Sequence, residues 1–168
     1  MQVMFGAAAL SAFKSSKLLL NLQAKLPQVE AFSAQFAHFL DCTEELTNHD
    51  LEVIHALLLY GASFTSSAAP QNTVSSLSRV VVPRPGTISP WSSKASDILH
   101  NCGLAKVERV ERGTVFTVQL SRPLETPELA ILDDMLHDRM TQAILSDVSK
   151  ASCLFRHAEP QAMASVDI

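Results

Sequence analysis

Residues 79–98, RVVVPRPGTISPWSSKASDI, contain the sharpest change of expected secondary structure in the chain. The run Arg79–Val82 is mostly β-branched and predicts a short strand, which Pro83 and Pro85 cannot continue because proline lacks the amide donor. Ser89-Pro90 is typical of a helix start, since serine caps free amides and proline loses no hydrogen bond at the first helical position. The stretch therefore predicts a strand, a rigid turn and a helix.

Upstream of this stretch, strand and helix patterns alternate. Apolar residues repeat at helical spacing before Pro27, whereas they occupy alternate places in the segment that follows it. Four elements are expected: a strand at Gln2–Phe5, a helix at about Ala9–Leu26, a half-buried strand around Phe32–Leu40 and a helix from Thr47 to Tyr60. Gly61 is the expected helix stop, and a polar surface loop is expected from there to Ser78.

Downstream, the helix that starts at Ser89-Pro90 is expected to end at Asn101, with Gly103 as its stop. Val107–Leu120 predicts either one long strand or a hairpin around Arg112-Gly113. A last helix is expected to open at Pro127, with an apolar stripe that extends from Leu132 to Val148. The alternation predicts an α+β fold, with a mostly antiparallel sheet of about four strands and about four helices packed on it.

The length and composition predict one globular domain. The chain has 168 residues, of which 47% are hydrophobic and 18% charged, a balance typical of a packed core. Residues 1–154 are expected to form the domain, and the Pro-, Ala- and Gln-containing stretch 155–168 is expected to be a tail or the start of a linker.

The charge pattern disfavours several classes of partner. The formal net charge is −4 and no basic run occurs, so a nucleic-acid partner is not expected. No apolar stretch approaches the roughly 20 residues that span a bilayer, and no membrane partner is expected. Three widely spaced cysteines do not form a disulfide framework, which favours a reducing cytoplasm.

Histidines and cysteines show no metal-binding pattern. His38 and Cys42 are four residues apart, and His100 lies two residues before Cys102, but paired CxxC or HxxxH spacing is missing. Buried cysteines and surface histidines explain these residues better than ligands do. A thiolate pair of His100 and Cys102 is disfavoured because helical residues two apart point in different directions.

The carboxylates near the end of the chain allow two interpretations. Asp133, Asp134 and Asp138 lie at helical spacing with His137 and Arg139, so a catalytic cluster is conceivable. A solvated helix face with local ion pairs explains them better. No catalytic residue and no metal ligand is predicted anywhere in the chain.

The start of the helix at Ser89-Pro90 is the most unusual candidate site. Hydroxyl groups, a lysine and the single tryptophan of the chain crowd the first helical turn. Free backbone amides and such donors suit an anion such as phosphate or carboxylate. Capping by Ser89, polar first-turn residues and a buried Trp91 explain the same residues without a ligand. Both interpretations remain open from the residues alone.

The same segment carries a family resemblance. Read on through HNCGL (100–104) and ERVERG (108–113), it resembles the signature near the amino terminus of large, single-chain phosphoribosylformylglycinamidine synthases. Shorter stretches also match: ALSAF (9–13), AQFAHF (34–39) and LHDRMT (136–141). The resemblance covers nearly the whole chain and implies a fold like a fused pair of the family's small accessory subunit.

The resemblance also implies a function. Such enzymes convert formylglycinamide ribonucleotide to its amidine in de novo purine biosynthesis, with ATP activating the amide oxygen and glutamine supplying ammonia. ATP and magnesium belong to a synthetase domain and the Cys-His-Glu triad to a glutaminase domain, neither of which fits in this chain. No cofactor is therefore expected in the chain itself, and the synthetase and glutaminase domains are its expected partners. A free-standing anion-binding or interaction module is the alternative.

On this resemblance, seven residues are expected to form an interdomain contact or a wall of the synthetase site, near the ammonia path. They are Arg84, Thr87, Ser89, Trp91, Ser92, Ser93 and Lys94.

Overall fold

The computed structural model describes residues 1–65 and 73–156, which contain one antiparallel sheet with helices packed on it. The strand order is β1-β2-β4-β3-β5. The strands are β1 (Gln2–Ala8), β2 (Val29–Cys42), β3 (Ser75–Pro83), β4 (Val107–Leu120) and β5 (Gln142–Leu145). The helices are α1 (Ala12–Lys25), α2 (Asn48–Leu58), α3 (Pro90–Asn101), α4 (Thr126–Leu136) and the 3₁₀ helix η1 (Val148–Phe155). The α+β prediction is confirmed, with five strands in place of about four.

The helix starts follow the predicted caps. Thr47 and Asp50 form a reciprocal capping box at the start of α2, which satisfies two amides that a helix leaves unpaired. At α3, the Ser89 hydroxyl accepts a hydrogen bond from the Ser92 amide at 3.0 Å. The predicted end of α3 is also confirmed, because Gly103 has a φ of +84°, a left-handed conformation that glycine adopts without strain.

Val107–Leu120 forms one continuous strand, so the hairpin alternative at Arg112-Gly113 is wrong. Gly113 pairs with Ala37 of β2 inside an unbroken register. A Cβ atom at Gly113 would lie 2.8 Å from the Val81 carbonyl oxygen. The glycine therefore serves the close approach of β3 to β4, and no turn is needed there.

The last predicted helix is wrong beyond Leu136. The chain turns at His137, whose φ of −138° is extended, and residues 142–145 form β5 against β3. Asp138 stabilises the turn, because its side chain accepts from the Met140 amide at 2.7 Å. The apolar stripe misled the prediction because a half-buried edge strand and a helix use the same residue types over a short run.

Other boundaries shift by a few residues. β1 extends to Ala8 and α1 begins at Ala12, after the Ser11 cap. β3 begins at Ser75, inside the predicted polar loop, of which residues 66–72 lie outside the described part. Most of the predicted tail, residues 157–168, also lies outside the described part, while Phe155 belongs to η1.

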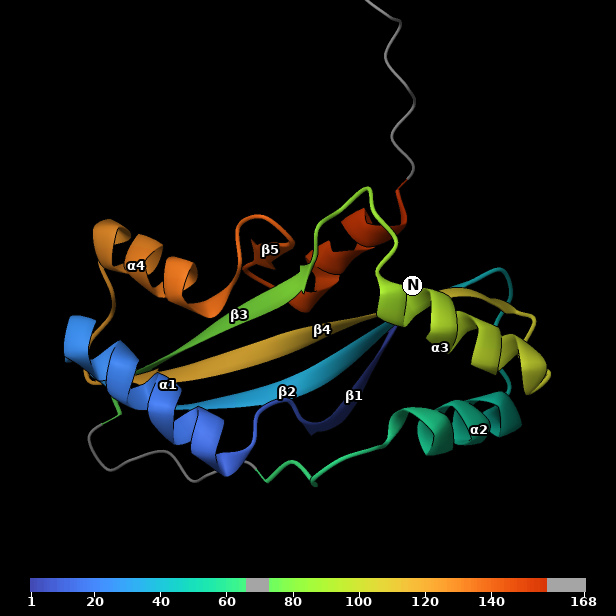
Figure 1. Cartoon of the computed structure of the whole chain (residues 1–168), viewed down its shortest axis with the longest axis horizontal. Helices are drawn as coiled ribbons and strands as arrows, with labels where there is room; N and C mark the ends of the chain where they lie inside the picture. Colours follow the sequence, from blue (N-terminus) through green and yellow to red (C-terminus); the bar gives the residue numbers. More distant parts are fainter. Residues whose placement is uncertain (66–72, 157–168) are drawn as a thin grey trace, which may run out of the picture.

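The helices divide over the two faces of the sheet. Ala34 and Leu40 lie an even number of residues apart on β2 and therefore face the same side. Ala34 packs with α1 and α4, and Leu40 packs with α2 and α3. Figure 1 shows α1 and α4 at one end of the sheet and α2 and α3 at the other. On the opposite face, Phe39 packs with η1. The two helix pairs thus cover the two ends of one face, and other side chains occupy the middle of that face.

No helix among the described residues is both long enough and apolar enough to cross a membrane.

Leu132 tests the core that joins α4 to the sheet. Its side chain is fully buried in the cluster shared with α1, β2 and β4. Leu132→Ala should lower the free energy of unfolding by about 2–5 kcal/mol, because it removes buried methyl groups and leaves a cavity. The neighbouring Ile131→Ala, at a side chain 39% exposed, should change it by less than about 0.5 kcal/mol. Urea denaturation measures both, and equal effects would contradict this packing.

Candidate functional site

The turn between β3 and α3 is held by hydrogen bonds within the chain. The Arg84 amide donates to the Thr141 carbonyl at 3.0 Å, which ties the turn to the segment before β5. The Thr87 hydroxyl donates to the Arg84 carbonyl at 2.7 Å. Gly86, with a φ of +86°, supplies the left-handed residue of the turn. The turn is therefore rigid, as the prolines predict.

A buried carboxylate on β4 fixes the start of α3. Glu111 is fully buried and its two oxygens accept from Ser89, from the amide at 3.2 Å and from the hydroxyl at 2.7 Å. The same Ser89 hydroxyl accepts from the Ser92 amide. Ser89 thus links the first turn of α3 to a strand more than twenty residues further along the chain.

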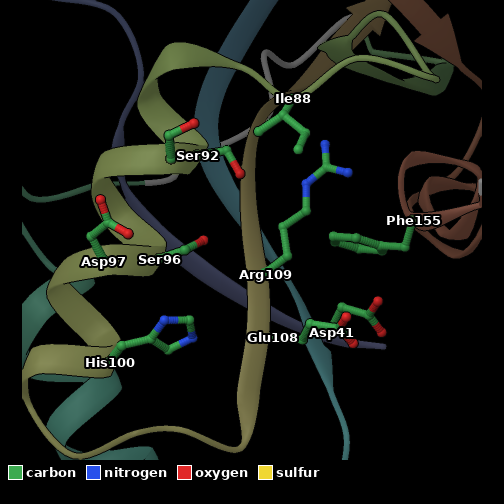
Figure 2. A pocket seen from close by; sticks show the side chains of 10 residues that line it. Asp41, Ile88, Ser92, Ser96, Asp97, His100, Glu108, Arg109 and Phe155 are labelled. Carbon is green, nitrogen blue, oxygen red and sulfur yellow. The ribbon is translucent and has the colours of Figure 1, made fainter.

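Arg109 completes this network from β4, where it lies two residues before Glu111 and on the same face of the strand. Its guanidinium forms an ion pair with Glu111 and donates to the Thr87 carbonyl at 2.8 Å. A second donor reaches the Leu154 carbonyl at 3.2 Å, and the guanidinium carbon lies 5.5 Å from the centre of the Phe155 ring. One side chain therefore joins the turn, β4 and η1. Figure 2 shows Phe155 beside Arg109.

A cleft of about 360 Å³ lies beside this network. Figure 2 shows Asp97 and His100 of α3 on one side of it and Arg109 and Phe155 on the other. The lining residues are Asp41, Ile88, Ser92, Ser93, Ser96, Asp97, His100, Glu108, Arg109 and Phe155. Three carboxylates and one guanidinium give the cleft an acidic balance, which does not suit the anion expected at the start of α3.

Two serines one helical turn apart face the strand from α3. The Ser96 hydroxyl accepts from the Val110 amide at 3.1 Å, so it satisfies a donor of β4 where β3 has ended. Ser92 is fully buried and its hydroxyl has no hydrogen-bond partner. Ser96 is therefore a structural residue, whereas the Ser92 hydroxyl is a spare polar group at the wall of the cleft.

A protein family described as formylglycinamide ribonucleotide amidotransferase N-terminal matches residues 35–155, more than two thirds of the chain. The chain belongs to this family. The match includes the turn, α3, the Glu111 and Arg109 network and η1, and it confirms the resemblance expected from the sequence.

In this amidotransferase N-terminal domain, five of the seven predicted site residues line three different hollows, and the other two belong to the turn. Ser92 and Ser93 line the cleft beside Arg109. Ser89 and Trp91 line a second cavity over the sheet, and Trp91 with Lys94 lines a third, apolar one against α2. Arg84 and Thr87 belong to the turn. Among these seven, the side chains of Arg84, Ser93 and Lys94 are exposed and form no hydrogen bond with residues 1–65 or 73–156.

The amides at the start of α3 are already in use. The Ser92 amide donates to the Ser89 hydroxyl, and the Ser93 amide donates to the Ser89 carbonyl at 3.2 Å. An anion at these amides would have to displace the internal cap. The capping interpretation of Ser89 is therefore confirmed.

Sequence reasoning missed the charged residues of β4. Glu111 and Arg109 alternate with Val110 inside a strand whose other face is apolar. Charged residues at alternate places in a central strand need partners when buried, which is the signal that could have identified them. Their partners, Ser89 and the Leu154 carbonyl, could not have been read from spacing.

The remaining candidates have structural roles in the domain. Asp134 pairs with Arg139, but α4 ends at Leu136, so this ion pair joins the helix to the following turn and the expected shared helix face is wrong. Asp133 pairs with Arg79 of β3 at 2.8 Å. The expectation of buried cysteines and surface histidines is wrong at two positions, because Cys102 is exposed and His38 is fully buried. His100 contacts the Val107 carbonyl at 2.6 Å. Within residues 1–65 and 73–156, no three His, Cys, Asp or Glu side chains are grouped closely enough to hold a metal ion.

Glu111→Gln tests the network at its centre. It leaves Arg109 half-buried without its carboxylate, and breaking such a pair should cost about 3 kcal/mol of unfolding free energy. Glu128→Gln is the control, because it breaks a pair with the exposed Arg122 and should cost much less. Chemical denaturation compares the two, and a smaller loss for Glu111→Gln would show that the network does not hold the turn.

His38 makes the stability of the domain depend on pH. Burial, followed by the nearby Arg112 guanidinium, lowers the pKa of His38 to about 4 from 6.5. The unfolded chain therefore takes up a proton below pH 6.5 that the folded chain refuses, and stability falls as pH drops from about 6.5 towards 4. Between pH 7.5 and 5.5 this one group should cost roughly 1 kcal/mol.

The measurement for His38 is the free energy of unfolding at the two pH values. In His38→Gln the difference in unfolding free energy between the two pH values should shrink by roughly 1 kcal/mol. His55→Gln, at an exposed position on α2, should keep it. An unchanged pH dependence in His38→Gln would mean that the folded protein accommodates a charged imidazole.

Proposed function

We propose that the chain is the noncatalytic amino-terminal part of an ATP- and glutamine-dependent ligase, the phosphoribosylformylglycinamidine synthase of de novo purine biosynthesis. The single observation that carries this proposal is the family match over residues 35–155. ATP and magnesium bind in a synthetase domain, glutamine is hydrolysed in a glutaminase domain, and both domains are partners of this one in the same cytoplasmic polypeptide.

The role proposed for this domain is to present a rigid surface to those partners. Ser89, Glu111 and Arg109 direct their polar groups inward, and the exposed Thr87 hydroxyl donates to the Arg84 carbonyl, so these groups hold the turn. The outward residues of the same segment stay free for contact. Ile88 is 60% exposed and Ile98 is 52% exposed, unusual positions for large apolar side chains.

Exposed apolar side chains beside polar ones are typical of a contact surface between domains. We place the contact at the turn and the outer side of α3, where Arg84, Ser93 and Lys94 supply the polar rim. On this proposal the surface forms one wall of the synthetase site and part of the path by which ammonia reaches it.

Ile88→Asp in the complete enzyme tests the contact. A buried carboxylate at the interface should weaken the docking of this domain and open the ammonia path to solvent. The rate with glutamine should fall about tenfold, the effect of losing one central interface residue. The rate with added ammonium salts should change much less, because ammonia then enters from solution.

Leu20→Asp is the matched control, since Leu20 is 68% exposed on α1, away from the turn. It should leave both rates near those of the unmodified enzyme. If Ile88→Asp had the same rate as the unmodified enzyme with glutamine, and also with ammonium salts, this surface would be excluded from the ammonia path.

A further inference from the structure

The middle of the helix-bearing face holds a second cavity, which is distinct from the cleft beside Arg109. It has a volume of about 290 Å³ and is lined by residues of β2, β3, β4, the start of α3 and the segment that leads into β5. Its lining residues are Phe36, Val81, Val82, Pro83, Ser89, Trp91, Arg112, Gly113, Thr114, Thr141 and Gln142. Arg112 is the single charged residue among them.

Aromatic rings hold the Arg112 guanidinium in place. Its central carbon lies 4.5 Å from the centre of the Phe36 ring and 4.9 Å from that of Trp91. Its Nη1 donates to the Tyr60 hydroxyl at 2.8 Å. Stacking on rings fixes the plane of the guanidinium, so little rotamer entropy remains to be lost when it binds a ligand.

The charge of Arg112 has no counterpart among the described residues. In the described ranges no carboxylate oxygen lies within 4.0 Å of its nitrogens. Four other arginines, Arg79, Arg109, Arg122 and Arg139, each pair with a carboxylate. A half-buried guanidinium without an anion is costly unless the anion arrives from outside.

The neighbouring His38 does not change the charge of the cavity. His38 contacts both Tyr60 and Trp91, with ring centres 5.9 and 5.6 Å apart, and it is fully buried. Because the pKa of His38 is lowered to about 4, its ring is neutral at pH 7 and neither adds to nor cancels the charge. The cavity is therefore positive through one side chain.

Neutral donors complete the cavity. Thr114 and Thr141 carry hydroxyl groups at its wall. The side-chain oxygen of Gln142, Oε1, accepts from the Asp138 backbone amide at 2.9 Å, so the side-chain NH₂ group of Gln142 remains available to a ligand. One fixed guanidinium with several neutral donors and no carboxylate is an arrangement that suits oxyanions.

We propose that this cavity binds the oxyanion group of a small molecule, a phosphate or a carboxylate, with Arg112 as the charged donor. Ligand pockets usually exceed about 300 Å³, so this cavity fits a small anion better than a whole nucleotide. The proposal concerns the 168-residue chain alone and does not depend on its place in a ligase.

Titration of the chain with inorganic phosphate and, separately, with acetate tests the proposal. Amide NMR signals of Gly113 and Thr114 should shift and saturate with at least one of the two anions. Tighter phosphate binding would identify a phosphoryl ligand, and tighter acetate binding a carboxylate ligand. Arg112→Gln should weaken the binding about tenfold or more, the usual effect of losing a hydrogen bond to a charged group.

Arg122→Gln is the matched control, because Arg122 is exposed near α4 and pairs with Glu128. It should bind the anion as the unmodified chain does. Thr114→Val keeps the shape and the charge of the cavity but removes a hydroxyl, so it should weaken anion binding less than Arg112→Gln does. It tests the cavity even if Arg112→Gln fails to fold. The proposal would be overturned if neither phosphate nor acetate gave saturable binding. Equal anion affinity in Arg112→Gln and Arg122→Gln would also overturn it.

Discussion

The arrangement of the β3–α3 turn, the start of α3 and η1 depends on the interactions of the Glu111 carboxylate. This carboxylate is fully buried, accepts two hydrogen bonds from Ser89 and pairs with Arg109. Through Arg109 it also reaches the Thr87 carbonyl and η1. A buried charge tolerates only well-placed partners, because an unpaired one loses its hydration without compensation. The turn, the start of α3 and η1 must therefore take up one mutual arrangement.

The second constraint is the spacing of the two helix pairs. Because α1 and α4 pack at one end of the face and α2 and α3 at the other, the middle is filled by rings and by Arg112. Between β1 and His38 the packing is tight, since a Cβ atom at Gly6 would lie 2.7 Å from the His38 ring. The same tightness removes water from His38 and lowers its pKa, which couples the stability of the domain to pH.

Local signals predicted most of the fold, and particular residues explain where they failed. Ser89-Pro90 and Gly103 bound α3 as predicted, because capping depends on neighbouring residues alone. The strand β5 was missed because its apolar residues continued the stripe of α4, and the unpaired edge of β3 decided their conformation. In the candidate site, the segment 83–94 was identified, but Glu111 and Arg109 were not. Their roles come from contacts with residues distant in sequence.

The sequence by itself determined the α+β class, the helix caps, the rigid turn and the family, because each is carried by residues close together in the chain. Only the tertiary structure decided what the side chains of that turn do. It directs the Ser89 hydroxyl inward to Glu111, leaves Ser93 and Lys94 outside, and sets Arg112 among three rings without a carboxylate. The reason is that strand pairing brings β4 beside a turn and rings from other parts of the chain, and burial and charge pairing depend on that proximity.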